Sequence, residues 1–468
     1  MTTTTTTPAR LNTAWLKLGA VIVTIFVVCW TIVIGYWHVI DHNPSAGDLA
    51  LALLVLPVGV LLALWGAGKA ISARAASIPT ATAKPAAPSP RTETAASTAM
   101  PVLAIMATAL RSPHGASAEE LAGAIADNEA RADLDKELVD DNGFPVMAAR
   151  SDDAHDQMLQ DEIAECLSSQ GMLLIFSEEQ WRALILATGV AAELASQAAG
   201  DLMPAEGSPP MLQLRLLLPH DWAADVRRAM TMWLKHTVCQ YGWPEASIAV
   251  PEVQDKDPAT PTTILTQLMP GTSSDTAPVL GLVIACASLI GQESVDRLTA
   301  QSSLFTSSQA RGQVPGEGAA GLLLTDLQLA RSCGAGFAVL GPLNEGRRDT
   351  SADDARRTDA ALLLDLAGQV SKAAALDISH ISMIVADTAH RPNRVLELMG
   401  LGAPALPQVD AADDIVRIGL GSGSCGAVPF VTVLAMAAHY ALERQAPILC
   451  IGNEDPYLRS AALVRSPV

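Results

Sequence analysis

The chain is poor in aromatic and in basic residues. Phe, Trp and Tyr make up only 4% of its 468 residues, and 30 Lys and Arg stand against 49 Asp and Glu, which gives a formal net charge of −19. A protein that binds nucleic acid needs a basic surface that neutralises phosphates. The composition therefore predicts no nucleic-acid partner, and the excess of acid is typical of a solvated cytosolic surface.

Cysteine is also scarce, and no two cysteines lie close together in the sequence. The seven residues are dispersed, without a Cys-x-x-Cys, at Cys29, Cys166, Cys239, Cys286, Cys333, Cys425 and Cys450. This spacing argues against a disulfide framework and a structural zinc site, and it favours buried free thiols in a reducing compartment. Walker A, Gly-x-Ser-x-Gly and His-Glu-x-x-His patterns are missing too. We expect neither a bound metal nor a cofactor.

Long apolar runs are present near the N-terminus, at Leu18–Trp37 and Leu49–Ala67. Each is about long enough for a helix that crosses the ~30 Å of hydrocarbon in a bilayer. The first run is too long for a cleavable signal peptide, and no cleavage pattern comes after it. Basic residues flank the pair on its outer sides and are missing from the loop between the runs; they are Arg10, Lys17, Lys69 and Arg74.

This distribution of basic charge predicts a two-helix membrane hairpin over residues 15–70, with both ends in the cytoplasm. Residues 1–14 would then form a cytoplasmic tail, and the protein would be a multi-pass protein of the inner (plasma) membrane. Residues 71–100 are rich in Ala, Thr, Ser and Pro, a composition that predicts a disordered linker.

The remaining residues, 101–468, alternate buried-strand and helix patterns, which predicts a layered α/β domain. The polar stretch Asn344–Asp353 suggests a division into two duplicated halves, 101–343 and 344–468. We expect Ala130–Asp161 to be an exposed insertion, because it is charged and has no clear apolar face. The Pro- and Thr-rich stretch Trp243–Met269 predicts a loop.

Glycines punctuate the segment Gly312–Leu324, which runs directly into an apolar strand. Gly316 and Gly318 allow a close approach of the backbone on either side of Glu317. A carboxylate held among small residues needs backbone donors or an Arg as neighbours. We therefore interpret Glu317 as a structural residue and not a catalytic one.

This segment resembles the Gly-x-x-x-Gly-Glu-Gly-Ala-Ala signature of the β-ketoacyl synthases, within the thiolase-like superfamily. Two further segments come after it in the order that the family has. Val385–Glu397 lies where the family carries Ala-His-Gly-Thr-Gly-Thr ending at a Glu, and Gly421–Ala427 resembles its Gly-His-x-x-Gly-Ala-Ala turn, with Gly426 and Ala427 in the matching places. The resemblance implies a five-layered αβαβα fold of two duplicated halves, and a homodimer.

The same resemblance implies acyl-transfer chemistry, but this chain lacks some of the residues that the chemistry needs. The family uses a Cys thiolate at a helix N-terminus and two histidines. The first histidine would fall at Ala386 or Asp387 and the second at Gly423, and none of these residues has an imidazole. His390 is the closest substitute, in the turn after the strand.

Two cysteines are candidates for the nucleophile if the protein is active. Cys286 lies in an Ala-Cys-Ala-Ser sequence that resembles the family's Ala-Cys-Ser-Ser. Cys239 is better spaced from the glycine segment, but it lies at the end of a predicted helix, where the helix dipole disfavours a thiolate. For each of them a buried, inert thiol is the simpler interpretation.

These residues leave three hypotheses. In the first, the protein is a membrane-anchored, catalytically degenerate ketosynthase-like domain that serves as a binding or scaffold module for a protein partner, for which a bacterial membrane or secretion system is one setting. In the second, it is an acyltransferase that acts on acyl thioesters through Cys286 and His390. In the third, it is an acyl-chain sensor that keeps an apolar tunnel without turnover.

Overall fold

The structure is a computed structural model that describes residues 101–468, apart from 205–206, 252–258, 270–277, 355–358 and 468. The predicted tail (1–14), membrane hairpin (15–70) and linker (71–100) lie outside the described residues. The chain divides into two units, Met1–Ala96 and Ser97–Val468, and the described residues all belong to the second.

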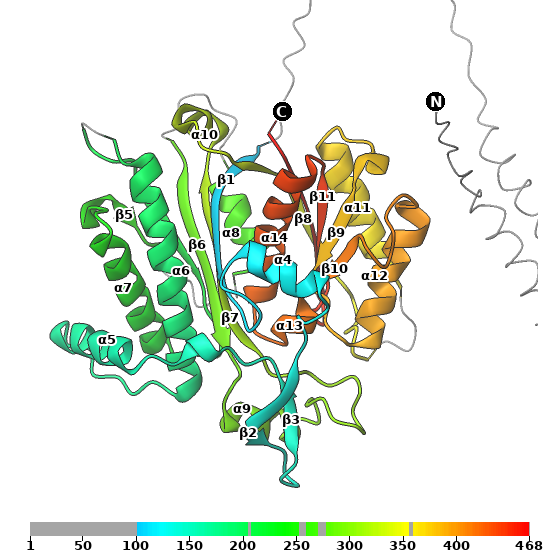
Figure 1. Cartoon of the computed structure of the whole chain (residues 1–468), viewed down its shortest axis with the longest axis horizontal. Helices are drawn as coiled ribbons and strands as arrows, with labels where there is room; N and C mark the ends of the chain where they lie inside the picture. Colours follow the sequence, from blue (N-terminus) through cyan, green and yellow to red (C-terminus); the bar gives the residue numbers. More distant parts are fainter. Residues whose placement is uncertain (1–100, 205–206, 252–258, 270–277, 355–358, 468) are drawn as a thin grey trace, which may run out of the picture. The chain divides into compact units, whose positions relative to one another are not determined.

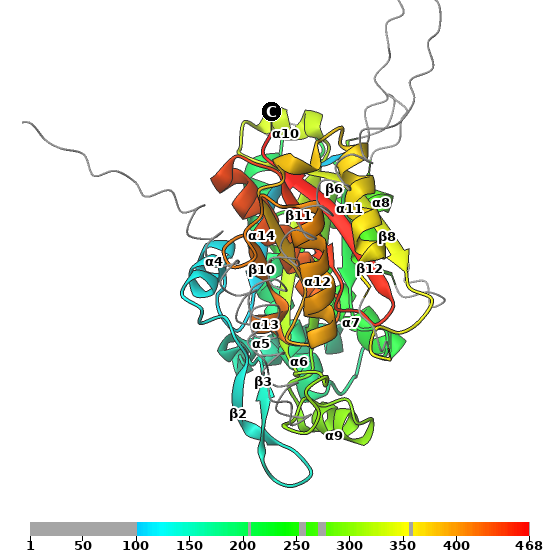
Figure 2. The same cartoon turned by 90° about the vertical axis from the view of Figure 1, so that its right-hand side faces the viewer.

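Ten strands of the described residues form one mixed sheet, in the order β10-β9-β11-β12-β8-β1-β7-β6-β4-β5. The earlier five are β1 (Leu103–Arg111), β4 (Leu212–Leu217), β5 (Ile248–Ala249), β6 (Leu280–Ser288) and β7 (Glu317–Thr325). The later five are β8 (Ala338–Arg347), β9 (Met383–Ala386), β10 (Ile415–Arg417), β11 (Ile448–Gly452) and β12 (Leu458–Arg465). A separate hairpin, β2 (Asp133–Val139) and β3 (Pro145–Ala148), projects from the body in both views (Figures 1 and 2).

The two sets of five strands repeat one topology. In each set the third strand by sequence lies at the outer edge, with the second, fourth, fifth and first arranged inward from it. The second strand pairs in parallel with the third and the fourth, whereas the fourth and fifth, and the fifth and first, are antiparallel. The sets meet where β1 pairs with β8. The chain therefore folds as two duplicated halves.

Helices cover the sheet and fill the space between its halves. They are α4 (Ala118–Ala126), α5 (Gln157–Ser169), α6 (Glu178–Leu202), α7 (Ala224–Gln240), α8 (Pro261–Leu268), α9 (Gln292–Ala300), α10 (Leu327–Cys333), α11 (Ala361–Ala373), α12 (Pro392–Ala405), α13 (Gly419–Ser422) and α14 (Val428–Arg444). Short 3-10 turns occur at η2 (Asp152–Ala154), η3 (Glu245–Ser247) and η4 (Ile378–His380).

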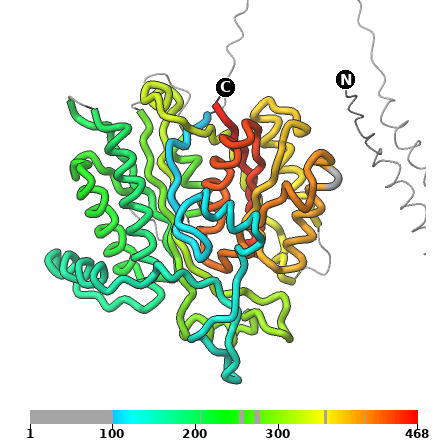
Figure 3. The backbone as a smooth tube through the Cα atoms, in the orientation of Figure 1, coloured from blue at the N-terminus to red at the C-terminus, as the bar shows by residue number. Residues whose placement is uncertain are grey.

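These helices create five layers, as Figure 1 shows from left to right. Helix α6, backed by α7, packs on β1, β6 and β7 from outside, and α11, beside α12, packs on β8 and β12 from the opposite side. Helix α14 lies in the middle and packs on strands of both halves, within a shared apolar core that also takes in α8. Figure 3 shows the earlier, green part of the chain on one side of this layer and the orange part on the other.

Local signals explain where the long helices begin. Ser177 and Gln180 form a reciprocal capping box that opens α6, in which each side chain bonds the other residue's backbone N–H. Helix α14 begins with a Pro in its first turn and has almost no polar side chain until its last turn, so burial on all sides stabilises it.

Helix α6 is, among the described residues, the one helix long and apolar enough to cross a bilayer. More than half of it is buried within the protein, and side chains such as Leu184, Val190 and Leu194 are fully buried against the sheet. A helix of this kind passes a hydropathy test because it is a core element.

Three of the expectations about the chain's organisation are wrong in detail. The stretch 130–161 is not only an exposed insertion, because it forms the β2–β3 hairpin with buried Leu138 and Val146 and the start of α5. The predicted loop 243–269 contains β5 and α8, since Ile264 and Leu265 pack in the central core. The division between the halves falls before β8, because this strand runs on to Arg347, where it pairs with Leu458 of β12.

Candidate functional site

Two of the three signature segments lie side by side. The backbone N–H of Gly316 donates to the carbonyl oxygen of Ser424 at 3.2 Å, and the N–H of Ser424 donates to Val314 at 2.8 Å. A Cβ atom at Gly316 would lie 1.9 Å from the carbonyl oxygen of Ser422, so only glycine fits there. The Gly312–Leu324 and Gly421–Ala427 segments thus form one joint between the halves of the molecule.

Glu317 is fully buried next to this joint and is held by donors on every side. Arg182 on α6 donates to it from Nε at 2.8 Å and also from Nη2, while the N–H of Ser151 donates at 2.7 Å and the hydroxyl of Ser288 at 2.9 Å. The predicted neighbours of this carboxylate, backbone donors or an Arg, are confirmed. Because its lone pairs are occupied, Glu317 fixes β7 to α6 and is not available as a base.

The glycine turn before α14 leaves no room for a side chain at the predicted second-histidine position. Gly423 has φ of 59°, in the left-handed region, and a Cβ there would lie 2.8 Å from the carbonyl oxygen of Val314. Gly426 has φ of 62°. Ala427 comes next as the N-terminal cap of α14, without a side-chain hydrogen bond.

The two residues predicted at the first-histidine position are both buried: Ala386 ends β9, and Asp387, with its carboxyl group, comes directly after it. Asp387 Oδ1 accepts hydrogen bonds from the backbone N–H groups of Asn453 at 2.7 Å and Glu454 at 3.1 Å. Burial raises the pKa of Asp387 to about 7; the nearby Glu454 adds to the rise, and the two N–H bonds oppose it. The carboxyl group joins the end of β9 to the turn between β11 and β12.

An ion-pair network surrounds Asp387. Its pairs are Arg391 with Asp353 (3.1 Å) and Glu454 (2.8 Å), Arg394 with Asp353 (2.7 Å), and Glu397 with Arg348 (3.0 Å) and Arg459 (2.8 Å). The side chains of Arg394 and Arg459 are fully buried. The sequence prediction missed this network; its one local signal is Arg391-Pro-Asn-Arg394 shortly after a buried strand. The network orders the loop that connects β9 to α12.

His390 lies in this loop, near the backbone of Gly312 and the carboxylate of Glu454. Its ring packs edge-on against Phe305, with the ring centroids 4.6 Å apart. Burial lowers the pKa of His390, so the imidazole is neutral. Its Nε2 atom is buried and has no hydrogen-bond partner among the described residues.

The candidate thiols are buried or poorly placed. Cys286 lies opposite Ala319 in the β6–β7 ladder and faces the core beneath α6, and burial raises the pKa of its thiol to about 12. Cys239 lies in the last turn of α7, where burial and Glu245 raise its pKa. The raised pKa of each thiol disfavours the thiolate that an acyl-transfer nucleophile needs.

Cys425 is the thiol that the sequence prediction did not weigh. Among the described cysteines it alone precedes a helix N-terminus, two residues before the cap of α14. It is buried, its Sγ contacts the carbonyl oxygen of Ser422 at 3.5 Å, and burial together with Glu317 raises its pKa. Burial and the neighbouring carboxylate therefore both disfavour a thiolate at Cys425, despite its place before a helix N-terminus.

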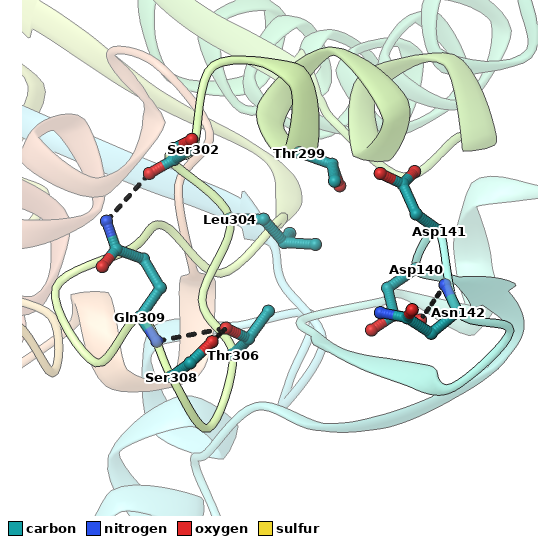
Figure 4. A pocket seen from close by; sticks show the side chains of 9 residues that line it. All are labelled: Asp140, Asp141, Asn142, Thr299, Ser302, Leu304, Thr306, Ser308 and Gln309. Carbon is teal, nitrogen blue, oxygen red and sulfur yellow. Dashed lines mark hydrogen bonds between the residues drawn. The ribbon is translucent and has the colours of Figure 1, made fainter.

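A pocket of about 340 Å³ opens elsewhere, between the β2–β3 turn and the segment after α9. Figure 4 shows its lining: Asp140, Asp141, Asn142, Thr299, Ser302, Leu304, Thr306, Ser308 and Gln309. Eight of these nine side chains are polar, which does not suit a hydrocarbon chain.

No protein-family model and no curated protein sequence matches the chain. Solved structures do. A ketosynthase from module 6 of the bacillaene synthase of Bacillus subtilis 168 gives a TM-score of 0.53 at 11% identity, over 78% of this chain and 72% of that one. A type II PKS ketosynthase bound to the hexaketide, in complex with its acyl-carrier protein, gives 0.53 at 12% identity over 79% and 100%. The ishigamide ketosynthase/chain length factor gives 0.51 at 14% identity over 78% and 100%. The chain has the thiolase-like fold in the form that ketosynthases have.

Proposed function

We propose that this chain is a ketosynthase-fold protein that has lost acyl-transfer chemistry and acts as a binding or scaffold module. One observation carries the proposal. The resemblance matches the first histidine to Ala386 or Asp387 at the end of β9, where Asp387 is bonded to two backbone N–H groups, and it matches the second to Gly423, which has no space for a side chain.

The state of the thiols supports the same proposal. A ketosynthase-like mechanism needs an accessible thiolate that accepts the acyl group. Here Cys286 and Cys425 are buried with raised pKa values. The alternative, an acyltransferase that uses Cys286 with His390, is disfavoured because Cys286 faces the core beneath α6.

Anchoring and assembly belong to the proposal as well. The apolar runs within residues 15–70 would hold the folded domain at a membrane, with the domain in the cytoplasm. Complexes of a ketosynthase with an acyl-carrier protein, or with a chain length factor, are named among the similar structures. We infer that this chain too works in an assembly, as a homodimer or with a protein partner.

Acylation of the purified protein tests the loss of chemistry. The protein is incubated with acetyl and octanoyl thioesters of N-acetylcysteamine and analysed by intact mass spectrometry. We expect no acyl adduct on the folded protein, whereas alkylation by iodoacetamide in concentrated urea modifies every thiol. An acyl adduct that maps to Cys286, Cys239 or Cys425 in the folded protein would overturn the proposal.

A further inference from the structure

The segment that connects α5 to α6 exposes two large apolar side chains to solvent. Leu173 is 86% exposed and Ile175 is 98% exposed. The alternate residues, Met172, Leu174 and Phe176, pack against the core that contains α6. This alternation is that of an extended strand with one face on the protein and the other face uncovered.

The same segment runs back along α5. The 13 residues of α5 cover about 20 Å, and the six steps from Gly171 to Ser177 cover about the same distance in an extended chain. The chain must return because the start of α6 contacts η2, which directly precedes α5; Arg182 Nη2 donates to the carbonyl oxygen of Ser151 at 2.9 Å. Figure 1 shows the connection beneath α5.

This return brings Ile175 toward the first turn of α5, where Met158 is 84% exposed. Met158 shares one face of α5 with Asp161, Glu162 and Glu165, since these residues recur at helical spacing. Exposed apolar side chains and a row of carboxylates therefore occupy α5 and the segment that follows it.

Charge excludes two of the possible occupants of this surface. Residues 151–181 contain no Lys and no Arg, and their exposed acids are Asp152, Asp153, Asp156, Asp161, Glu162, Glu165 and Glu178. A second copy would place a like charge against this one, and the anionic surface of a cytoplasmic leaflet would also be repelled. A cationic partner is attracted.

The backbone of the segment is open to a partner as well. Between Leu173 and Phe176 no backbone N–H or carbonyl bonds another backbone group in the part of the chain that the structure describes. Extended segments of this kind accept an added strand, whose alternate side chains lie over the exposed apolar ones.

We propose that Leu173–Ile175 and the acidic face of α5 form a docking surface for an extended segment of a partner protein in which apolar residues alternate with Lys or Arg. The added strand pairs with the backbone of Leu173–Ile175 and covers Leu173 and Ile175, while its cations meet the carboxylates of α5. The proposal names the class of partner for the binding role proposed above, and it rests on that role.

Binding of a model peptide to the full-length protein in detergent tests the proposal. The probe is acetyl-Lys-Val-Lys-Val-Lys-Val-Lys-amide with a fluorescent label, titrated at low and at high NaCl concentration and measured by anisotropy. We expect saturable binding that weakens with salt, and a loss of affinity of about tenfold or more in Leu173→Ser/Ile175→Ser, because both apolar contacts are removed. The matched control Leu396→Ser, which changes a 60% exposed leucine on α12, should bind like the parent.

A second variant separates charge from apolar contact. Glu162→Lys/Glu165→Lys should also lose affinity, and its remaining binding should depend less on salt. Equal binding by the parent and Leu173→Ser/Ile175→Ser, or equal binding of a Glu-Val peptide of the same length, would overturn the proposal. Binding of phosphatidylglycerol vesicles or self-association that Leu173→Ser/Ile175→Ser abolishes would overturn it too, in favour of a bilayer or a second copy. None of these readouts involves a thioester, so their failure is distinct from a failed acylation result.

Discussion

The two halves of the molecule share a strand order but differ in the helix that comes after the third strand. After β5 the earlier half has α8, a helix of 8 residues, whereas after β10 the later half has the short α13 and then α14, a helix of 17 residues that packs on both halves. The N-terminal cap of α8 is Thr260, and no Cys occurs between Cys239 and Cys286. The two halves thus share the strand topology, while the described helix between β5 and β6 is short and has no Cys at its N-terminus.

The halves also differ in how each holds a buried carboxyl group. Glu317, at the start of β7, bonds a guanidinium through both of its oxygens. Asp387, at the end of β9, bonds only backbone N–H groups and lies near Glu454. Burial raises the pKa of a carboxyl group that has no hydrogen-bonded cation, and the nearby Arg459 only partly opposes this rise at Asp387. One half therefore uses an ion pair where the other uses a group that titrates near neutral pH.

The largest effect is expected for the ion pair of the earlier half. Glu317→Ala leaves the guanidinium of Arg182 buried without its carboxylate, which should lower the free energy of unfolding by about 3–5 kcal/mol. Urea unfolding measured by tryptophan fluorescence gives this loss, since Trp233 is buried in the same core.

The pair of Arg111 with Glu193 provides the control for this prediction. It has a similar distance, 2.9 Å, but its side chains are 22% and 37% exposed. Glu193→Ala should therefore lower the free energy of unfolding by less than about 1 kcal/mol. Equal losses in the two variants would show that burial of the Glu317 pair has no energetic consequence.

The carboxyl group of Asp387, in the later half, should make the stability of the protein depend on pH. The pKa of Asp387 is raised from 3.8 to about 7 in the folded protein, so the folded state binds the proton more tightly than the unfolded state. Its contribution to stability is then full below about pH 4 and is lost as the pH rises to about 7 and above. Asp387→Asn keeps the acceptor oxygen and removes this loss, so at about pH 8 it should be more stable than the parent by roughly 4 kcal/mol.

Unfolding curves at a series of pH values between about 5 and about 8 measure this difference. The gap between Asp387→Asn and the parent should widen with each upward step in pH. A gap that is the same at every pH would mean that Asp387 does not change its protonation in this range, and the contrast between the two carboxyl groups would not hold.

The sequence predicts the joint and its carboxylate better than it predicts the second half. The glycines around Glu317 and the need of that carboxylate for an Arg or backbone donors are local properties, and both are confirmed. The identity of the Arg is not local, because Arg182 comes from a helix 135 residues away in the sequence. Likewise the network around Asp387 joins the segment after β8, α12 and the β11–β12 turn, and no single segment reveals it.

Helix α8 shows where prediction of the fold from the sequence fails. Thr260 and Pro261 are start signals for a helix, yet the Pro and Thr content around them predicts a loop. Burial of Ile264, Leu265 and Leu268 in the central core outweighs this composition. Nor does the sequence predict helix α12, since Gly400, Gly402 and Pro404 lie within it.

The smallest effect concerns the joint between the halves. Gly316→Ala places a Cβ against the carbonyl oxygen of Ser422, across the joint, so the two turns must move apart; we expect a loss of about 2 kcal/mol in the free energy of unfolding. Gly336→Ala is the matched control, because nothing lies within 4 Å of a Cβ at that position. Chemical denaturation of both variants measures the difference. If Gly316→Ala is as stable as Gly336→Ala, the two turns can separate without cost, and the halves are held together by the β1–β8 pairing and the central core around α14.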